Sequence, residues 1–392
     1  MTALSNVPLR VLVSPVSTWS PLKPGNDEDF DYIDLSAIDQ KLKAIVSARK
    51  VQCTDAPSRA RQLVRRGDVL VSTVRPNLNG VAMVPPELDG ATASTGFCVI
   101  RANREMLEPS YVFHWVKSAT FVSRMVAQAT GASYPAVSDR IVLDAEIPLP
   151  SLPEQRRIAA ILDKADGLRT KRGEALAQLD RLAQSIFMEM FGDPVTNPKG
   201  WPLRSFNDAC PTRLGKMLDQ KQQTGQHSRK YLRNANVQWF RFDLSDLLEM
   251  DFDEAARETF ALKDGDLLIC EGGEPGRAAI WRNQIPDCYY QKALHRGRPD
   301  PSLANSEYLM WLLWCLAQRG GLSDHVTSAT IAHLTGEKLK AIQIPLPPLQ
   351  LQSQFVERLK AHERLRLRAE QALTGQDLLF ASLQHRAFRG EL

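Results

Sequence analysis

Ile147-Pro-Leu-Pro-Ser-Leu-Pro-Glu-Gln-Arg-Arg-Ile158 stands near the middle of the chain, and Ile344-Pro-Leu-Pro-Pro-Leu-Gln-Leu-Gln352 stands near its end. Both runs begin Ile-Pro-Leu-Pro, and they lie 197 positions apart in a chain of 392 residues. A long stretch with helical spacing of apolar residues follows each run. The sequence therefore predicts a long helix in each half of the chain, preceded in both halves by the same Ile-Pro-Leu-Pro segment.

Four further pairs of segments repeat at nearly the same offset. They are Arg66–Val71 with Asp264–Ile269, Tyr111 with Tyr308, Tyr32 with Tyr231, and Phe191 with Phe388. Because the pairs keep the same order along the chain, they predict an internal duplication. A duplicated reader suits a ligand with two halves, such as DNA. An old duplication without functional meaning is the alternative.

Each half is expected to hold a mixed domain followed by its long helix. In the first half, β-branched and aromatic residues between turn residues predict strands at 31–36, 68–75 and 96–101, and a helix at 110–129. The second half shows strands near 266–270 and 278–281, a helix at 306–319 and a loop at 327–335. The fold class is therefore α/β (α+β), with two mixed domains joined by two long antiparallel, coiled-coil-like helices. The expected boundaries are 1–150 and 198–347 for the mixed domains, and 151–197 and 348–392 for the helices.

A seven-residue pattern from Ile158 predicts that the two long helices pair with each other. A helix from Ile158 to Phe191 would span roughly 50 Å, enough to set two readers about one DNA turn apart. Gly167, Gly173 and Gly375 make kinks possible, and an ordinary oligomerising coiled coil is the alternative. The predicted seam residues are Ile158, Ile161, Leu168, Leu179, Leu182 and Ile186 in the first helix, and Phe355, Leu359, Leu365, Leu379 and Leu383 in the second.

The composition is that of a soluble globular protein, with 43% hydrophobic and 24% charged residues and a net charge of +4. The chain shows no signal peptide and no apolar run of membrane-spanning length, so we expect a cytoplasmic protein without membrane contact. Six scattered cysteines without a CxxC pair are expected to be buried thiols. Without an HExxH pattern we also expect no metal site.

Signatures of common DNA enzymes are missing. Asn197-Pro-Lys199 lacks the second proline and the aromatic residue of a base-gripping methyltransferase loop, and Gly215-Lys216 lacks the upstream glycine of a phosphate-binding loop. Asp287 with Lys292 is a degenerate match to a nuclease motif, and Glu271–Gly276 resembles a hairpin turn more than a cofactor loop. We therefore expect no catalytic residues, although an enzyme with cryptic motifs stays an alternative.

Basic and amide side chains gather in segments that suit DNA binding. Arginine, asparagine and glutamine read base edges, while lysine and arginine bind phosphates. Solvated loops would explain any one of these residues equally well. The candidate DNA-binding residues are Arg49, Lys50, Arg59, Arg61, Arg75, Asn77 and Asn79 in the first half, and Lys216, Lys221, Gln222, Gln223, His227, Arg229, Lys230 and Arg277 in the second.

The run at 147–158, with the helix ending Gln184–Pro194, resembles the central region of specificity (S) subunits of type I restriction–modification systems. The segment Phe380–Leu392 is similar to the C-terminal region of that family. The resemblance implies that residues 1–150 and 198–347 are target recognition domains, each reading one half of a split, asymmetric DNA site.

It further implies that the helices act as spacer and docking surface for two methyltransferase (M) subunits, which restriction (R) subunits then join. S-adenosylmethionine, ATP and Mg would be bound by those partners and no cofactor by this chain. One departure is that Pro153-Glu-Gln-Arg156 of the first copy becomes Gln350-Leu-Gln-Ser353 in the second, which leaves the symmetry of docking open. A non-DNA scaffold and a type II-like system with a fused partner are the remaining alternatives.

Overall fold

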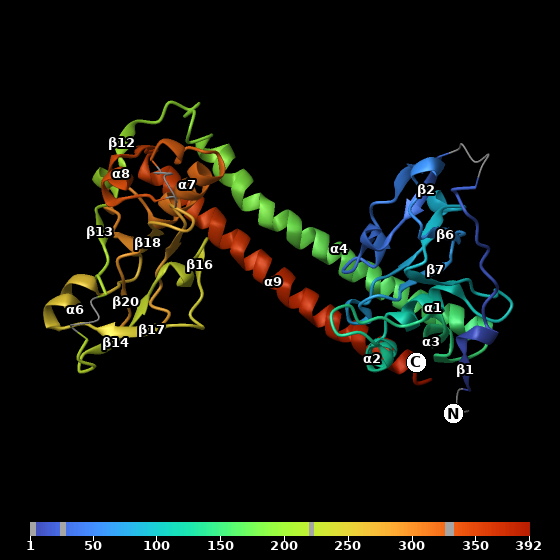
Figure 1. Cartoon of the computed structure of the whole chain (residues 1–392). Coiled ribbons are helices and arrows are strands. Elements are labelled where there is room, and N and C mark those ends of the chain that lie inside the picture. Colours follow the sequence, from blue (N-terminus) through green and yellow to red (C-terminus); the bar gives the residue numbers. More distant parts are fainter. Residues whose placement is uncertain (1–4, 24–28, 219–222, 326–332) are drawn as a thin grey trace. The chain divides into compact units, whose positions relative to one another are not determined.

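The computed structural model describes residues 5–23, 29–218, 223–325 and 333–392. They form two compact units, of which the first comprises Met1–Leu176 with Ala369–Leu392 and the second comprises Ala177–Arg368. The long helices α4 (Leu152–Phe191) and α9 (Leu349–Ala387) contribute residues to both units (Figure 1). Within the described part of the chain, no helix has the length and apolar character needed to cross a membrane.

The first unit contains two sheets, a strand ladder and three short helices. One sheet has the order β5-β2-β9-β6, from Arg49–Gln52, Asp29–Ile33, Thr92–Ser94 and Ala60–Leu63. The other has the order β10-β7-β8, from Phe97–Ile100, Val69–Ser72 and Val81–Met83. The remaining elements are the ladder β1 (Asn6–Pro8) with β11 (Glu146–Pro148), the hairpin β3 (Ile38–Asp39) with β4 (Ala44–Ile45), and the helices α1 (Pro109–Val116), α2 (Ala119–Gln128) and α3 (Asp139–Leu143).

The second unit repeats this plan. Its sheets have the order β13-β21-β18-β19, from Thr212–Leu214, Leu294–Gly297, Leu267–Cys270 and Ala278–Ile280, and the order β17-β14-β20, from Leu248–Asp251, Ser228–Leu232 and Tyr289–Tyr290. The ladder is β12 (Leu203–Ser205) with β22 (Gln343–Pro345), and the hairpin is β15 (Val237–Gln238) with β16 (Arg241–Phe242). The helices are α5 (Phe206–Ala209), α6 (Glu254–Phe260), α7 (Ser306–Gln318) and α8 (Gly336–Ala341).

The central strands β7 and β18 explain the repeated Gly-Asp-apolar motif of the sequence. Alternate residues of a strand face opposite sides, and in β7 Val69 and Val71 enter the core beneath the helices while Leu70 enters the core between the sheets. β18 divides its residues in the same way. Strands buried on both faces need a continuous apolar run. The aspartates before them, Asp68 and Asp266, are buried and bind Arg101 and Arg298, each at 2.7 Å.

Side-chain bonds recur at matched positions of the two units. Gln155 accepts a hydrogen bond from the backbone N–H of Glu108 and donates to the carbonyls of Met106 and Pro150. Gln352 makes the same three bonds with Asn305, Leu303 and Pro347. The hydroxyl groups of Tyr111 and Tyr308 donate to Pro148 and Pro345, at 2.8 and 2.6 Å. The internal duplication predicted from the sequence is confirmed down to individual hydrogen bonds.

Most predicted elements are confirmed, with one helix divided. The strands predicted around 31–36, 68–75, 96–101, 266–270 and 278–281 correspond to β2, β7, β10, β18 and β19. The single helix predicted at 110–129 is wrong, because Lys117 and Ser118 separate α1 from α2 and the Ser118 hydroxyl caps α2 by accepting from the N–H of Phe121. Residues 327–332 of the predicted loop lie outside the described residues. Gly167, Gly173 and Gly375 lie inside unbroken helices.

The seam between the long helices can be followed in each unit by itself. In the first unit, Ile158 and Leu162 of α4 share a core with Phe380 and Ala387 of α9, and Leu383 packs against that core. In the second unit, Phe187 and Met190 of α4 share a core with Phe355 of α9, and Ile186 and Leu359 pack against it. The early residues of one helix meet the late residues of the other, so the pairing is antiparallel in both units.

Part of the predicted seam is wrong. Leu168, Leu182, Leu365 and Leu379 are 51%, 43%, 54% and 56% exposed, and Ile161 is half-exposed. The seam instead steps from Ile158 to Leu162 and continues through half-buried Arg169, whose Nε donates to Asp377 at 2.7 Å. At the matched position of the second unit, Arg366 donates to Asp180 at 2.7 Å. Polar residues take these seam positions, so a search for apolar residues follows the neighbouring stripe, which faces solvent.

Candidate nucleic-acid interface

Four predicted basic residues of the first unit belong to one sheet. Arg49 and Lys50 are exposed on the edge strand β5, and Arg59 and Arg61 lie beside and within β6 at the opposite edge. Arg49 is 3.1 Å from the carboxylate of Asp34 and lies over the ring of Tyr32, while the Arg61 Nε donates to the Ser58 carbonyl. The sheet therefore carries exposed cationic groups at both edges.

The turn after β7 gathers the remaining candidates of the first unit. Arg75 and Asn77 are exposed, and the guanidinium of Arg75 lies 4.8 Å from the ring centre of Tyr134, which is 68% exposed. The backbone N–H of Arg75 donates to the Pro135 carbonyl at 2.7 Å. Arginine and asparagine pair in bidentate fashion with guanine and adenine edges. We call Lys43, Arg75, Asn77, Asn79 and Tyr134 the first reading turn.

The backbone of the first reading turn is strained. Lys43, Arg75 and Asn79 have φ angles of 54°, 50° and 46°, in the left-handed region that non-glycine residues seldom occupy. The Lys43 ammonium donates to the Asn79 carbonyl at 2.6 Å and thereby ties the β3–β4 hairpin to the turn. Burial, reinforced by the charge of Lys117, lowers the pKa of Lys43 below its usual value. Such strain persists where the surroundings enforce it, and it concentrates at functional sites.

A second polar loop is organised by one carboxylate of the second unit. Asp251 accepts from the backbone N–H and the hydroxyl of Thr224, and from the N–H groups of Gly225 and His227. The N–H of Asp251 donates to the Gln223 amide oxygen at 2.7 Å. Burial alone would raise the pKa of Asp251, but the hydrogen bonds from Thr224, Gly225 and His227 lower it below its usual value. We call residues 223–230 the second reading loop.

Several predicted readers of the second unit are engaged within the protein. The Lys216 ammonium donates to the Asp251 carbonyl, Arg229 pairs with Asp287 at 2.6 Å, and Arg277 contacts Glu274 and the Asn234 carbonyl. His227 and Lys230 are exposed on the loop and its strand. Lys221 and Gln222 lie outside the described residues. Among the described candidates of this unit, the exposed side chains are therefore those of His227 and Lys230 in the second reading loop.

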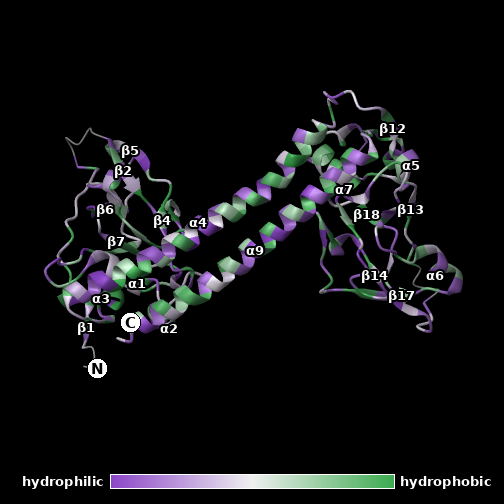
Figure 2. Cartoon of the chain, turned by 180° about the vertical axis from the view of Figure 1, so that it is seen from behind, coloured by the Kyte–Doolittle hydropathy of each residue, from purple (hydrophilic) through white to green (hydrophobic). Residues whose placement is uncertain are grey.

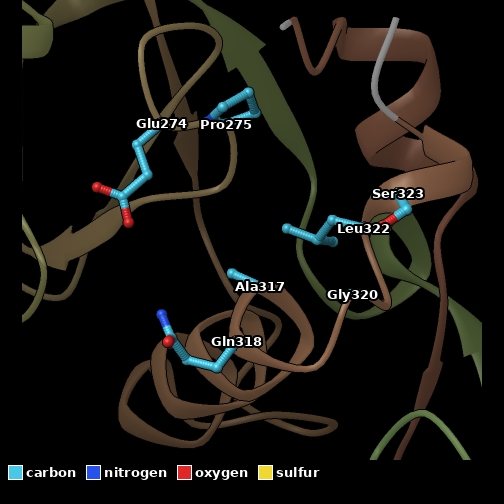
Figure 3. Close-up of a pocket in the computed structure, with 7 residues that line it drawn as sticks. All are labelled: Glu274, Pro275, Ala317, Gln318, Gly320, Leu322 and Ser323. Atoms are coloured by element: carbon cyan, nitrogen blue, oxygen red, sulfur yellow. The ribbon is translucent and has the colours of Figure 1, made fainter. Parts of the chain in front are cut away.

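The turn that matches the first reading turn has a different chemistry in the second unit. Glu274 lies at its tip, where its carboxylate accepts from the indole of Trp239 at 2.6 Å and contacts Arg277. An open pocket of about 470 Å³ separates this turn from the end of α7 (Figure 3). In the first unit α2 follows α1 closely, whereas α7 ends before Gly320 and leaves this space. The other residues lining the pocket are Pro275, Ala317, Gln318, Gly320, Leu322 and Ser323.

Exposed apolar residues form a further surface along the long helices. The ribbons of α4 and α9 carry hydrophobic residues along their whole length between hydrophilic ones (Figure 2). In the first unit Leu168, Leu378 and Leu379 are exposed, and in the second unit Leu182, Leu365 and Leu367 are exposed. Leu367 also lines an open groove of about 480 Å³ along α9, together with the charged residues Glu357, Lys360, Glu363, Arg364 and Arg366. We call these six leucines the outer stripe.

Catalytic chemistry finds little support in the described residues. Among them, no group of three or more histidine, cysteine or acidic side chains is placed to hold a metal ion. All six cysteines are buried thiols. Burial raises the pKa of Cys98 and Cys210 far above the usual range and that of Cys270 to about 11, which disfavours the nucleophilic thiolate. The exposed polar side chains of the two reading segments are suited to binding.

Sequence reasoning missed Lys43, Tyr134 and Asp251. Lys43 joins the site through a contact with Asn79 across a hairpin, and Asp251 organises a loop from a neighbouring strand. Neither contact leaves a local trace in the sequence. Tyr134 could have been found from the sequence, because it is an aromatic residue in the Gly131–Pro135 turn, where no amphipathic pattern predicts that it is buried.

Comparisons with known proteins agree on one family. A family model described as the type I restriction modification DNA specificity domain matches residues 65–179 and 198–374, once in each repeat. The specificity subunit of the type I restriction enzyme HindI from Haemophilus influenzae is 26% identical over 141 residues, which cover 36% of this chain and 31% of that protein. The EcoKI specificity subunit from Escherichia coli is 23% identical over 321 residues, covering 76% of this chain and 68% of that protein.

A solved structure shares the fold over the whole chain. It belongs to a study of complex assembly and conformational transition of the type I R-M system, and its matching chain is 28% identical with a TM-score of 0.71. The match covers 100% of this chain and 99% of that one.

Proposed function

The chain belongs to the type I restriction modification DNA specificity family, and we propose that it recognises a bipartite, asymmetric DNA sequence and directs partner subunits to it. As in its relatives, it is the non-catalytic specificity subunit of such a system. One reading unit would contact each half of the site. The observation that carries this proposal is that two copies of one fold present different side chains at matched turns, Arg75–Asn79 in one and Glu271–Arg277 in the other.

Different turns on the same scaffold give a physical basis for an asymmetric site. Arg75 and Asn77 offer donors for guanine and adenine edges, whereas Glu274 offers an acceptor for an amino group. Exposed cations elsewhere on the two units, among them Lys50, Arg59 and Lys230, would bind phosphates and give salt-dependent affinity. Phosphate contacts set the register, and the turns select bases.

The partners follow from the same proposal. Two methyltransferase subunits that bind S-adenosylmethionine would dock on the long helices, and restriction subunits that use ATP and Mg would join them. The outer stripe supports this, since in each unit both helices expose leucine side chains that a partner could cover. The helices would also set the gap between the two half-sites.

The decisive experiment joins the chain to its natural partner. We would co-express it with the methyltransferase encoded beside its gene and map methylated adenines in the host genome by direct sequencing. A single split motif that disappears when this chain is omitted is the expected result. Methylation that persists unchanged without this chain would overturn the proposal. A stable complex that leaves no methylated adenine and binds no DNA fragment would indicate a scaffold instead.

A further inference from the structure

The β15–β16 hairpin of the second unit ends in an aromatic cluster that has no counterpart in the first unit. Its two-residue loop is Trp239-Phe240. The Phe240 ring lies beside that of Trp239 and also contacts the rings of Trp311 and Trp314 on α7. Trp311 and Trp314 have their own ring centres 5.4 Å apart. Phe240 is 37% exposed, and the three tryptophans are half-buried. We call these four residues the aromatic patch.

The matched place in the first unit is occupied by polar side chains that pair with carboxylates. His114 and Lys117 occupy the positions of Trp311 and Trp314, and both are buried, His114 at 1% exposure. They are capped by Asp163 at 2.7 Å and Asp166 at 2.5 Å, both on α4. Lys43, at the position of Phe240, bonds to Asn79. In the first unit His114 Nε2 and the Lys117 ammonium are paired with carboxylates of α4, whereas the second unit leaves aromatic rings partly open to solvent.

Phe240 has a backbone conformation that phenylalanine rarely adopts. Its φ angle is 66°, and turns that need a positive φ at their second central residue favour glycine or asparagine over bulky residues. A phenylalanine in the left-handed region is an outlier that local folding preferences do not explain. This strained conformation places a large apolar ring at the tip of the hairpin, where the ring is partly exposed to solvent. Strain of this kind points to a function.

The chemistry of the patch favours a protein over a nucleic acid. The only polar atoms of these four side chains are the indole N–H groups, and that of Trp239 already donates to Glu274. Exposed tryptophan and phenylalanine dominate binding energy at protein interfaces, whereas DNA interfaces are strongly positive. The patch lies beside α9, because the ring of Trp311 contacts that of Phe355, and Leu359 one turn later packs on the same buried core. Next along the helix comes the groove that contains Leu367 of the outer stripe.

From this position beside α9 we infer that the aromatic patch extends the docking surface for one of the two methyltransferase subunits. The methyltransferase that docks on the second unit would then be bound more tightly than the one on the first unit. The inference rests on the proposed function. The part of the methyltransferase that covers the patch would present aliphatic or aromatic side chains. The first unit lacks the patch, so its methyltransferase would bind more weakly, and assembly would pass through a complex with one methyltransferase.

Phe240→Gly tests the inference, because glycine relieves the strained φ angle and thereby offsets part of the packing lost with the ring. We would titrate the chain with the neighbouring methyltransferase and count bound subunits by native mass spectrometry. The wild type should show two unequal steps. The variant should weaken the tighter step roughly tenfold or more and leave the other unchanged. Leu42→Gly, at an exposed position of the matched hairpin of the first unit, is the control and should alter neither step more than about twofold.

Other outcomes separate the inference from its premise. Two unchanged steps in Phe240→Gly, or equal losses in both steps with a lowered melting temperature, would overturn the inference. Weaker DNA binding with intact methyltransferase binding would make the patch a nucleic-acid surface and overturn it as well. Failure of the wild type to bind any methyltransferase would refute the proposed function itself. Trp314→Ala serves as a second variant and should reproduce the loss in the tighter step.

Discussion

Asp251 concentrates several contacts of the second reading loop in one carboxylate. It accepts hydrogen bonds from Thr224, Gly225 and His227, which face it from the loop. In Asp251→Asn an amide NH₂ replaces one acceptor oxygen and meets these donors, so the loop should lose its conformation. We expect binding to the second half-site to weaken roughly tenfold while the first half-site stays intact. Electrophoretic mobility shifts with DNA altered in one half-site would measure both, and equal loss at both half-sites would contradict the assignment.

The Asp251 carboxylate should also make the stability of the folded chain depend on pH. The pKa of Asp251 lies below its usual value of 3.8 in the folded chain. A depressed carboxyl pKa contributes stability that is present above the unfolded-state value and is lost as the pH falls through the folded-state value. Unfolding followed between pH 7 and pH 3 should therefore show the Asp251 contribution constant near neutrality and decreasing only in the acidic range. Asp251→Asn should flatten that acidic decrease.

Arg75 and Lys50 are expected to contribute to DNA binding in different ways. Arg75 lies in the first reading turn, so Arg75→Ala should cost about 1–3 kcal/mol against the correct sequence and relax selection at one base pair. Lys50 is exposed on an edge strand, so Lys50→Ala should weaken binding to all sequences and lower the salt slope by about one. Binding measured against a set of single-base variants at several salt concentrations separates the two. The same loss for every sequence in Arg75→Ala would remove it from base reading.

For single residues, the sequence identified side chains with suitable chemistry but did not show which of them are free to bind a ligand. Arg75 and Asn77 are exposed in a strained turn, as a reader requires. Lys216, Arg229 and Arg277 have the same chemistry but bind the Asp251 carbonyl, Asp287 and Glu274. Their partners belong to other strands or turns, and a one-dimensional pattern does not say which arginine meets which carboxylate. Charge alone therefore identified candidates and could not rank them.

Among the elements, the long helices offer a direct test of the corrected seam. Leu162 is fully buried and Leu168 is 51% exposed, although both are leucines on α4. Leu162→Ala should destabilise the protein by about 2–5 kcal/mol because it leaves a cavity. Leu168→Ala should change the free energy of unfolding by no more than about 0.5 kcal/mol. Urea denaturation of the two variants would decide, and the reverse order would restore the seam predicted from the sequence.

The outer stripe makes a separate prediction about docking. Leu365→Glu places a charge on an exposed face of α9, so the isolated chain should fold as stably as the wild type. Capture of the methyltransferase should nevertheless decrease roughly tenfold or more, because a partner helix would bury that charge without a counter-ion. Pull-down with the methyltransferase gives the measurement. Gln371→Glu, which adds a charge at an exposed position of the same helix outside the groove, is the control. Normal capture by Leu365→Glu would exclude this face as a docking surface.

Strands and helices were easier to predict than their partners. β7 and β18 are apolar runs bounded by Gly-Asp, and burial on both faces explains why the pattern is so clear. The division between α1 and α2 escaped prediction because Ser118 interrupts an otherwise helical apolar pattern through its capping bond. The seam escaped in part because Arg169 and Arg366 occupy it. An arginine whose charge is met across the interface packs like an apolar residue through its aliphatic stem.

For the whole molecule, the duplication was fully legible in the sequence, since one offset of 197 relates the turns, the helices and the paired bonds of Gln155 and Gln352. What a repeat cannot reveal is where its copies diverge in function. The aromatic patch and the charged cluster of His114 and Lys117 occupy matched positions, yet only the three-dimensional contacts show that one place is closed and the other open.

The repeat also permits a test of the proposed spacer. Removing residues 170–176 from α4 and the matched residues 367–373 from α9 deletes one heptad from each helix and leaves the remaining seam in register. Each helix shortens by about 10 Å, which corresponds to at most about three base pairs of B-DNA. The methylated motif of this variant should keep the bases of both half-sites and shorten the gap between them. Deletion from α4 alone mismatches the helices and should abolish methylation. An unchanged gap in the paired deletion would show that the helices do not set the distance between the half-sites.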